Sequence, residues 1–128
     1  MARMLIVDDS IMMRKTLRTI LQRAGHTIEA EAVNGEQAVT FYTKHRPDLV
    51  TLDITMPGIS GIEAIKQIRE FDPDANIIIV SALGQKQTIF EALQNGARNY
   101  IMKPITEEKL LSVVNMVLGL SHDSSTPA

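Results

Sequence analysis

Five polar side chains of the chain each stand at the end of a short, mainly apolar run, and all five are of types that can bind a divalent metal ion or a phosphoryl group. They are Asp8, Asp9, Asp53, Ser81 and Lys103. The apolar runs before them cover residues 4–7, 49–52, 77–80 and 100–102. If these runs are parallel strands of one sheet, their carboxyl ends meet at one edge, where open α/β folds bind ligands.

This set of side chains matches the chemistry of phosphoryl transfer. Three carboxylates at one edge would repel one another unless a cation neutralised them, and hard oxygen ligands favour Mg²⁺ or a similar divalent ion. A carboxylate can attack phosphorus and form an aspartyl phosphate. Mg²⁺ and a lysine would then offset charge on the phosphoryl oxygens, and a serine hydroxyl would donate a hydrogen bond to one of them. The combination predicts a phosphoryl acceptor.

Each residue taken alone also has an ordinary structural explanation. An Asp pair after a strand is common as a turn and helix N-cap, and Ser81 could be a turn residue. Lys103, which precedes Pro104, could be an exposed loop lysine. Only the conjunction of all five favours a site over these separate explanations.

Composition excludes several other classes of function. The chain has 128 residues, 45% of them hydrophobic and 22% charged, which is enough for one domain with a substantial core. A net charge of -2 gives no bias toward nucleic acid or anionic membranes, so we expect neither as a partner. The absence of cysteine excludes disulfides, thiolate zinc sites and a Cys nucleophile. No apolar run approaches the roughly 20 residues of a membrane helix and no signal peptide is recognisable, so we expect a cytoplasmic protein.

Short β-branched runs alternate with helical patterns along the chain. Strands are predicted at about 3–8, 27–33, 48–53, 76–81 and 98–102. Helices are predicted over 10–24, from the capping boxes that begin at Asn34 and Ser60, near 86–95, and from Thr106 to about Gly119. Five βα units of this kind imply a parallel sheet with right-handed crossovers and helices on both faces.

The hydrophobic patterns of two predicted strands indicate their places within that sheet. Residues 77–80 are apolar at every position and fit a central strand, whereas residues 27–32 alternate and fit an edge strand. We expect one domain over residues 1–119 and a flexible tail over 120–128, which lacks periodicity. The histidines at 26, 45 and 122 have no ligand spacing and are expected on the solvated surface.

From about Met4 to Leu118 the chain resembles the receiver domain of two-component response regulators. The matching motifs are Asp8-Asp9, the segment Asp-Ile-Thr-Met-Pro-Gly-Ile-Ser-Gly at 53–61, Ser81-Ala82 and Lys103-Pro104. The resemblance implies a doubly wound (βα)5 flavodoxin-like fold, a three-layer sandwich whose five-stranded parallel sheet has the order 2-1-3-4-5.

The resemblance also implies a role for each residue at the acidic end of the site. Asp53 is expected to be the phosphoacceptor and a ligand of Mg²⁺. Asp9 is expected to bind the metal directly, and Asp8 partly through water. The backbone carbonyl of Thr55 is expected to supply a further ligand.

At the other end of the site, Ser81 and Lys103 are expected to contact the phosphoryl group. The resemblance implies a cis peptide bond between Lys103 and Pro104, which X–Pro bonds tolerate at roughly 0.5–1 kcal/mol. Tyr100 matches the aromatic switch position. Phosphorylation would draw Ser81 toward the phosphate, Tyr100 would turn inward, and the surface of the fourth helix, fifth strand and fifth helix would change for a partner to read.

Among stand-alone receivers, the segments 53–57 and 81–85 look most like those of CheY-like chemotaxis proteins. This likeness implies a monomer that receives its phosphoryl group from a histidine kinase of the CheA kind. The expected target is a flagellar motor switch protein of the FliM kind or another output protein, with a phosphatase as a further partner. A phosphorelay intermediate and a receiver fragment of a larger regulator stay open as alternatives.

A phosphatase of the haloacid-dehalogenase type is a weaker alternative. Such enzymes combine a nucleophilic Asp, a hydroxyl, a Lys and metal ligands, but need a second Asp two residues after the nucleophile as general acid. Thr55 stands at that position, so we expect self-phosphorylation and slow autodephosphorylation in place of enzymatic turnover. Ile54 and Leu83 are apolar beside the site and are expected to affect the dephosphorylation rate. Gly58 and Gly61 are expected to serve turn and packing needs.

Overall fold

The strands and helices of the chain alternate as predicted. The computed structural model describes residues 1–55, 60–82 and 84–120. Within these residues the strands are β1 (Arg3–Val7), β2 (Thr27–Ala32), β3 (Leu49–Asp53), β4 (Ile77–Ser81) and β5 (Asn99–Met102). The helices are α1 (Ile11–Arg23), α2 (Gly35–His45), α3 (Gly61–Phe71), α4 (Lys86–Gln94) and α5 (Glu107–Leu118). All strand pairs are parallel and the sheet order is β2-β1-β3-β4-β5, which confirms the predicted flavodoxin-like fold.

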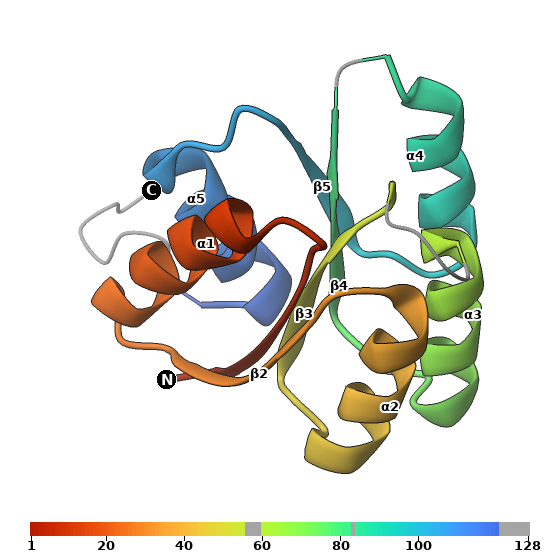
Figure 1. Cartoon of the computed structure of the whole chain (residues 1–128), viewed down its shortest axis with the longest axis horizontal. Coiled ribbons are helices and arrows are strands. Elements are labelled where there is room, and N and C mark those ends of the chain that lie inside the picture. The colour runs from red at the N-terminus through yellow and green to blue at the C-terminus, as the bar shows by residue number, and fades with distance from the viewer. Residues whose placement is uncertain (56–59, 83, 121–128) are drawn as a thin grey trace.

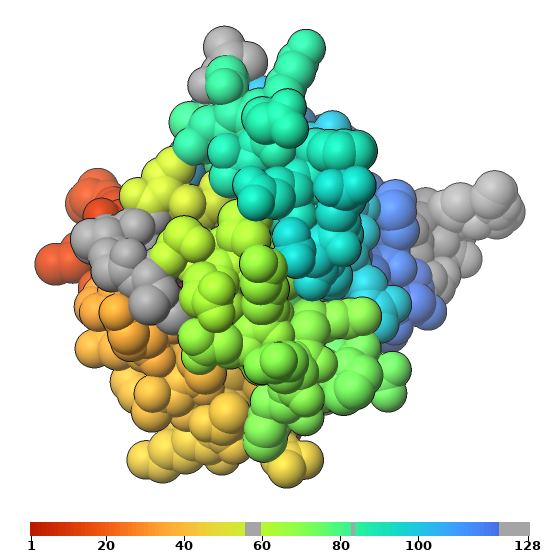
Figure 2. Space-filling view, turned by 90° about the vertical axis from the view of Figure 1, so that its right-hand side faces the viewer, coloured from red at the N-terminus to blue at the C-terminus, as the bar shows by residue number. Residues whose placement is uncertain are grey.

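The sheet forms the middle of three layers. Helices α1 and α5 cover one face, and α2, α3 and α4 cover the other (Figure 1). Each face has its own apolar cluster: Ile6, Leu49 and Ile101 point toward α1 and α5, whereas Val7, Leu52 and Ile79 point toward α2, α3 and α4. Figure 2 shows the outer surface of the second helical layer, where α3 and α4 lie beside one another.

Strand burial follows the sequence patterns. Every residue of β3 and of β4 is buried, as expected for interior strands with a helix layer on each side. Strand β2 forms an edge of the sheet and keeps Thr27 exposed, which confirms its prediction as an edge strand.

The helix starts also follow the predicted capping residues. The side chains of Asn34, Ser60 and Thr106 accept hydrogen bonds from the backbone N–H three residues later, at 2.8, 3.1 and 3.1 Å. The side-chain oxygen of Gln37 accepts a hydrogen bond from the N–H of Val33, whereas a capping box would use the N–H of the next residue, Asn34. The helices therefore begin within one or two residues of their predicted positions.

His26 differs from its prediction. Its side chain is buried, with 8% of the residue exposed, and Nδ1 accepts a hydrogen bond of 3.1 Å from the backbone N–H of Ala2. The sequence around His26 predicts a turn, but the backbone of Ala2, just before β1, is hydrogen-bonded to the ring of His26 and to the N–H of Thr27. Burial lowers the pKa of His26, and the positive N-terminus lowers it further.

We expect the buried imidazole to make the fold less stable in mild acid. The unfolded chain binds a proton at His26 near pH 6.5, while the folded chain resists protonation because its pKa is lower. The free energy of unfolding should therefore fall as the pH drops below about 6.5. Chemical denaturation of His26→Asn and the parent at pH 7.5 and 5.5 should show a smaller decline in the variant. Equal declines in the two proteins would show that His26 is not the cause of the acid sensitivity. Asp8, whose raised pKa has the opposite effect on stability, is present in both proteins and does not affect the comparison.

The structure describes only part of what the sequence predicted about membrane helices and the C-terminal tail. No helix within residues 1–55, 60–82 and 84–120 is long and apolar enough to cross a membrane. Residues 121–128 of the predicted tail lie outside the described residues, as do Met56, Pro57, Gly58, Ile59 and Leu83.

Candidate phosphoryl-acceptor and metal site

The five chemically active side chains predicted from the sequence come together at the carboxyl edge of the sheet. Successive side chains of a strand point to opposite faces. Asp8 therefore lies on the same face as Ile6, Asp53 on the same face as Leu49, and Lys103 on the same face as Ile101, all toward α1 and α5. Ser81 lies on the opposite face with Ile79. Parallel pairing of β1, β3, β4 and β5 brings these strand ends to one edge.

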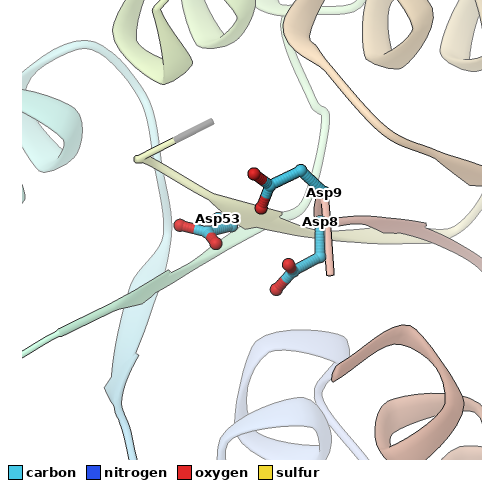
Figure 3. A group of neighbouring side chains, drawn as sticks. All are labelled: Asp8, Asp9 and Asp53. Carbon is cyan, nitrogen blue, oxygen red and sulfur yellow. The ribbon is translucent and has the colours of Figure 1, made fainter. Parts of the chain in front are cut away.

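Three carboxylates form a compact cluster at this edge. Figure 3 shows Asp8 and Asp9 at the end of β1 and Asp53 at the end of the neighbouring strand β3. One oxygen from each residue lies within 4.8 Å of the other two. Asp8 and Asp53 are buried, with 1% and 2% of each residue exposed, while Asp9 is exposed. The cluster is thus closed toward the protein and open on the side of Asp9.

The two oxygens of Asp53 have different surroundings. Oδ1 accepts hydrogen bonds from the N–H of Thr55 at 2.9 Å and from the Thr55 hydroxyl at 2.7 Å. Oδ2 lies 3.3 Å from the Lys103 ammonium. The carboxylate is therefore held in one orientation by donors on both sides.

Lys103 links two of the carboxylates. Its Nζ atom lies 3.3 Å from Asp53 Oδ2 and 3.9 Å from Asp8 Oδ2. The backbone N–H of Lys103 also donates to the carbonyl of Ser81 at 2.8 Å, and the Lys103–Pro104 peptide bond is cis. The ammonium offsets part of the negative charge of the three carboxylates, and it forms the only ion pairs with them within the part of the chain that the structure describes.

The environment of Asp8 indicates that Lys103 compensates only part of the negative charge of the cluster. Burial raises the pKa of Asp8, and the nearby carboxylates of Asp53 and Asp9 raise it further, while the Ser10 N–H and Lys103 act against this rise. Oδ1 accepts the Ser10 N–H at 2.9 Å, whereas Oδ2 is buried without a hydrogen-bond partner among the described residues. A buried acceptor of this kind is costly unless a cation or donor satisfies it.

These atoms fit a divalent cation with oxygen ligands. Opposite ligands of an octahedral Mg²⁺ ion lie about 4.2 Å apart and adjacent ligands about 3 Å apart. Oxygens that all lie within 4.8 Å of one another are close enough to bind one such ion once the side chains draw together around it. An ion there would satisfy Asp8 Oδ2 and relieve the repulsion that raises the pKa of Asp8.

The face opposite the cluster holds the two residues of the predicted switch. Ser81 is fully buried, and its hydroxyl has no hydrogen-bond partner among the described residues. Tyr100 is 41% exposed and lines a groove of about 330 Å³ between α4 and β5. Gly84, Phe90 and Met102 are among the other residues of this groove. Ser81 thus has an unused donor, and Tyr100 stands outward on the same face of the sheet.

Residues beside the acceptor differ in how far the structure describes them. Ile54 is buried in the cluster that faces α2, α3 and α4, so its side chain points into the core. A Cβ on Gly61 would lie 2.9 Å from the Ile54 Cα, which agrees with the prediction that this glycine allows close packing. Leu83 and Gly58 lie outside the described residues.

Sequence reasoning missed two contacts of the site. The hydroxyl of Thr55 donates to Asp53, a contact that a strand-end pattern does not reveal. The guanidinium of Arg14 donates to the backbone carbonyl of Asp8 at 2.8 Å. An arginine four residues into a helix gives no signal of such a role, since helical arginines usually face solvent.

Comparison with known proteins agrees with this geometry. The response regulator receiver domain family matches residues 4–115. The chain belongs to this family.

Individual relatives show which members of the family the chain resembles. Two proteins of Bacillus subtilis are each 47% identical to the chain: protein CcdB over 119 residues, covering 93% of this chain and 99% of CcdB, and chemotaxis protein CheY over 117 residues, covering 91% and 98%. A crystal structure of the CheX–CheY–BeF3–Mg complex from Borrelia burgdorferi contains a similar chain, with a TM-score of 0.86 and 43% identity over 90% of this chain and 87% of that one. These relatives support the assignment of the chain as a chemotaxis response regulator, which the sequence motifs also predict.

Proposed function

We propose that the chain is a chemotaxis response regulator that accepts a phosphoryl group on Asp53 with Mg²⁺. The observation that carries the proposal is the acid cluster with its single ammonium: Asp8, Asp9 and Asp53 within 4.8 Å, and Lys103 at 3.3 Å from Asp53. Such a site can position and charge-stabilise a phosphoryl group without further catalytic groups, because phosphoryl transfer depends mainly on positioning and electrostatics.

The residues divide the work of the transfer. A carboxylate oxygen of Asp53 attacks the phosphorus and an O–P bond forms. The N–P bond to the histidine of a kinase breaks, and the imidazole, already protonated at its other nitrogen, leaves as the neutral group. Asp8, Asp9, Asp53 and the Thr55 carbonyl would hold Mg²⁺, which would supply charge neutralisation for the phosphoryl oxygens. Lys103 supplies a second positive charge, and the Ser81 hydroxyl donates to one oxygen. Thr55 holds Asp53 in its orientation through two hydrogen bonds.

The same site would drive the output switch. The Ser81 hydroxyl, which has no hydrogen-bond partner among the described residues, would gain an acceptor when phosphate arrives, so phosphorylation favours a state in which Ser81 has moved toward it. Tyr100 lies on the same face and would turn inward from the groove beside α4. The surface of α4, β5 and α5 then differs between the two states, with Phe90, Tyr100 and Met116 as its exposed large apolar side chains.

A kinase of the CheA kind as donor and a motor switch protein of the FliM kind as target follow from the likeness to CheY. The Borrelia structure is that of a CheY in complex with CheX, BeF3 and Mg, which supports protein partners and the use of Mg²⁺ for the present chain as well. We propose a cytoplasmic location and a monomer.

Incubation with acetyl phosphate tests the core of the proposal. With Mg²⁺, intact-mass analysis should show the gain of one phosphoryl group, and the gain should disappear in EDTA and in Asp53→Ala. A gain that does not depend on the metal, or that persists in Asp53→Ala, would refute it.

A second experiment separates chemotaxis from a phosphorelay. Purified motor switch protein should be captured several-fold more by the phosphorylated form than by the resting form. Equal, negligible capture in both states, together with onward transfer of the phosphoryl group to a histidine-containing protein, would favour the relay.

A further inference from the structure

We propose that Arg14 and Glu31 form a clamp that fixes the backbone at Asp8 and thereby sets the affinity of the site for Mg²⁺. This inference rests on the proposed function and names residues that lie outside the acid cluster itself. Arg14 is a positioning residue: it touches the main chain of a metal ligand and not the metal or the phosphoryl group.

The geometry of Arg14 joins three elements. Side chains of a helix tilt toward its N-terminus, so an arginine in the second turn of α1 can reach back to the loop after β1. Nη1 donates to the carbonyl of Asp8 at 2.8 Å, and Nε donates to Glu31 at 3.1 Å. Only 14% of the Arg14 side chain is exposed. The planar guanidinium thus uses two donors in fixed directions, a geometry that lysine cannot reproduce.

Glu31 ties this arrangement to the edge strand. It lies on β2 opposite Ile6 of β1, two residues before Asp8. One carboxylate oxygen accepts from Arg14 and the other from Arg18, so two arginines of α1 hold a single acid of β2. A network of partly buried charges of this kind restricts the positions of its side chains more than one exposed ion pair does.

Both peptide groups of Asp8 are therefore anchored to β2. Its N–H donates to the carbonyl of Ala32 at 3.0 Å, and its carbonyl is held by Arg14, which is held by Glu31. The side-chain oxygen of Asp8 also accepts the N–H of Ser10, which fixes the start of the loop. With its main chain fixed, Asp8 and the adjacent Asp9 are preorganised around the position of the metal.

Charge explains why the clamp needs Glu31. A lone guanidinium beside the acid cluster would compete with a divalent cation. The carboxylate of Glu31, which lies between Arg14 and Arg18, offsets part of that charge and so lowers the repulsion between Arg14 and the metal. Partners of this outer kind typically change metal affinity by about 10–100-fold when they are removed.

The test compares Arg14→Met, Arg14→Lys and Glu31→Gln with Arg23→Met, a control with the same charge change on the same helix, whose side chain is exposed. Calorimetric titration of the metal-free proteins with Mg²⁺ should give a dissociation constant about tenfold higher or more for Arg14→Met. Arg14→Lys should fall between the parent and Arg14→Met, Glu31→Gln should weaken binding several-fold, and Arg23→Met should match the parent. At saturating Mg²⁺, the rate of phosphorylation by acetyl phosphate should stay within about twofold of the parent, because the clamp acts on binding of the metal.

Hydrogen exchange provides a readout without metal. The Ser10 amide of metal-free Arg14→Met should exchange about tenfold faster than in Arg23→Met, since the loop loses its anchor. Equal Mg²⁺ affinity and equal Ser10 exchange in these two variants would overturn the clamp. If Arg14→Met does not fold, parent-like Mg²⁺ binding in both Arg14→Lys and Glu31→Gln would overturn it. Absence of Mg²⁺-dependent phosphorylation in the parent would refute the proposed function instead, and Ser10 exchange would still decide the clamp.

Discussion

Asp8→Asn should make the metal-free protein more stable and should remove most of the stabilisation that Mg²⁺ provides. The carboxylate of Asp8 is buried beside two other acids, and burial raises its pKa. A group with a raised pKa in the fold contributes stability below its unfolded pKa and loses that contribution as the pH rises through its folded pKa. At pH 7, above the pKa of Asp8 in the unfolded chain, Asp8 therefore costs stability, and asparagine removes this cost while keeping an oxygen for the Ser10 N–H.

Thermal unfolding in EDTA and in Mg²⁺ measures both effects. In EDTA the variant should be more stable by about 0.5–2 kcal/mol, the usual range for a single stabilising substitution. At a Mg²⁺ concentration about 100 times the dissociation constant the parent should gain about 2.7 kcal/mol and the variant much less, so the order of stability reverses. Asp74→Asn, the same change at an exposed turn, should show neither effect. A variant that is less stable in EDTA, or that gains as much from Mg²⁺ as the parent, would contradict this account.

The fold and the cluster were predictable because both depend on local pattern. Each of Asp8, Asp53 and Ser81 follows a short, mainly apolar run, and parallel pairing brings such strand ends together whatever the side chains do in detail. The helix starts were predictable for a similar reason, since the cap at Asn34 is satisfied within four residues. Errors of one or two residues arise at the ends, where hydrogen bonds are shared with the loops.

The contacts that sequence did not reveal all depend on distant partners or on rotamers. His26 accepts a hydrogen bond from the N–H of Ala2, which lies 24 residues earlier in the chain. Arg14 meets Glu31 only because β2 returns beside β1. Thr55 was predicted through its carbonyl, yet its hydroxyl also binds Asp53, and a side-chain rotamer decides this. Local pattern therefore predicts where a site lies, and tertiary contacts decide how firmly it is held.

Lys103→Met should slow phosphorylation of Asp53 by about 100-fold or more while it strengthens the binding of Mg²⁺. The Lys103 ammonium lies 3.3 Å from Asp53 and 3.9 Å from Asp8, so it offsets negative charge that otherwise attracts the metal. Removing one preorganised group that stabilises developing charge typically costs 10²–10³ in rate. Removing a positive charge a few ångströms from two carboxylates lowers the repulsion felt by an incoming cation.

The opposite signs of these two effects distinguish a charge role from damage to the fold. Rates of phosphorylation by acetyl phosphate should be measured at saturating Mg²⁺, and Mg²⁺ affinity by calorimetry. Lys66→Met removes the same charge from an exposed position of α3 and should change neither quantity by more than about twofold. A misfolded site would lose affinity and rate together, and weaker Mg²⁺ binding in Lys103→Met would contradict the charge role. Tighter Mg²⁺ binding with a slow reaction would show that the metal alone does not suffice and that the second cation at Lys103 is needed when charge develops on the phosphoryl oxygens.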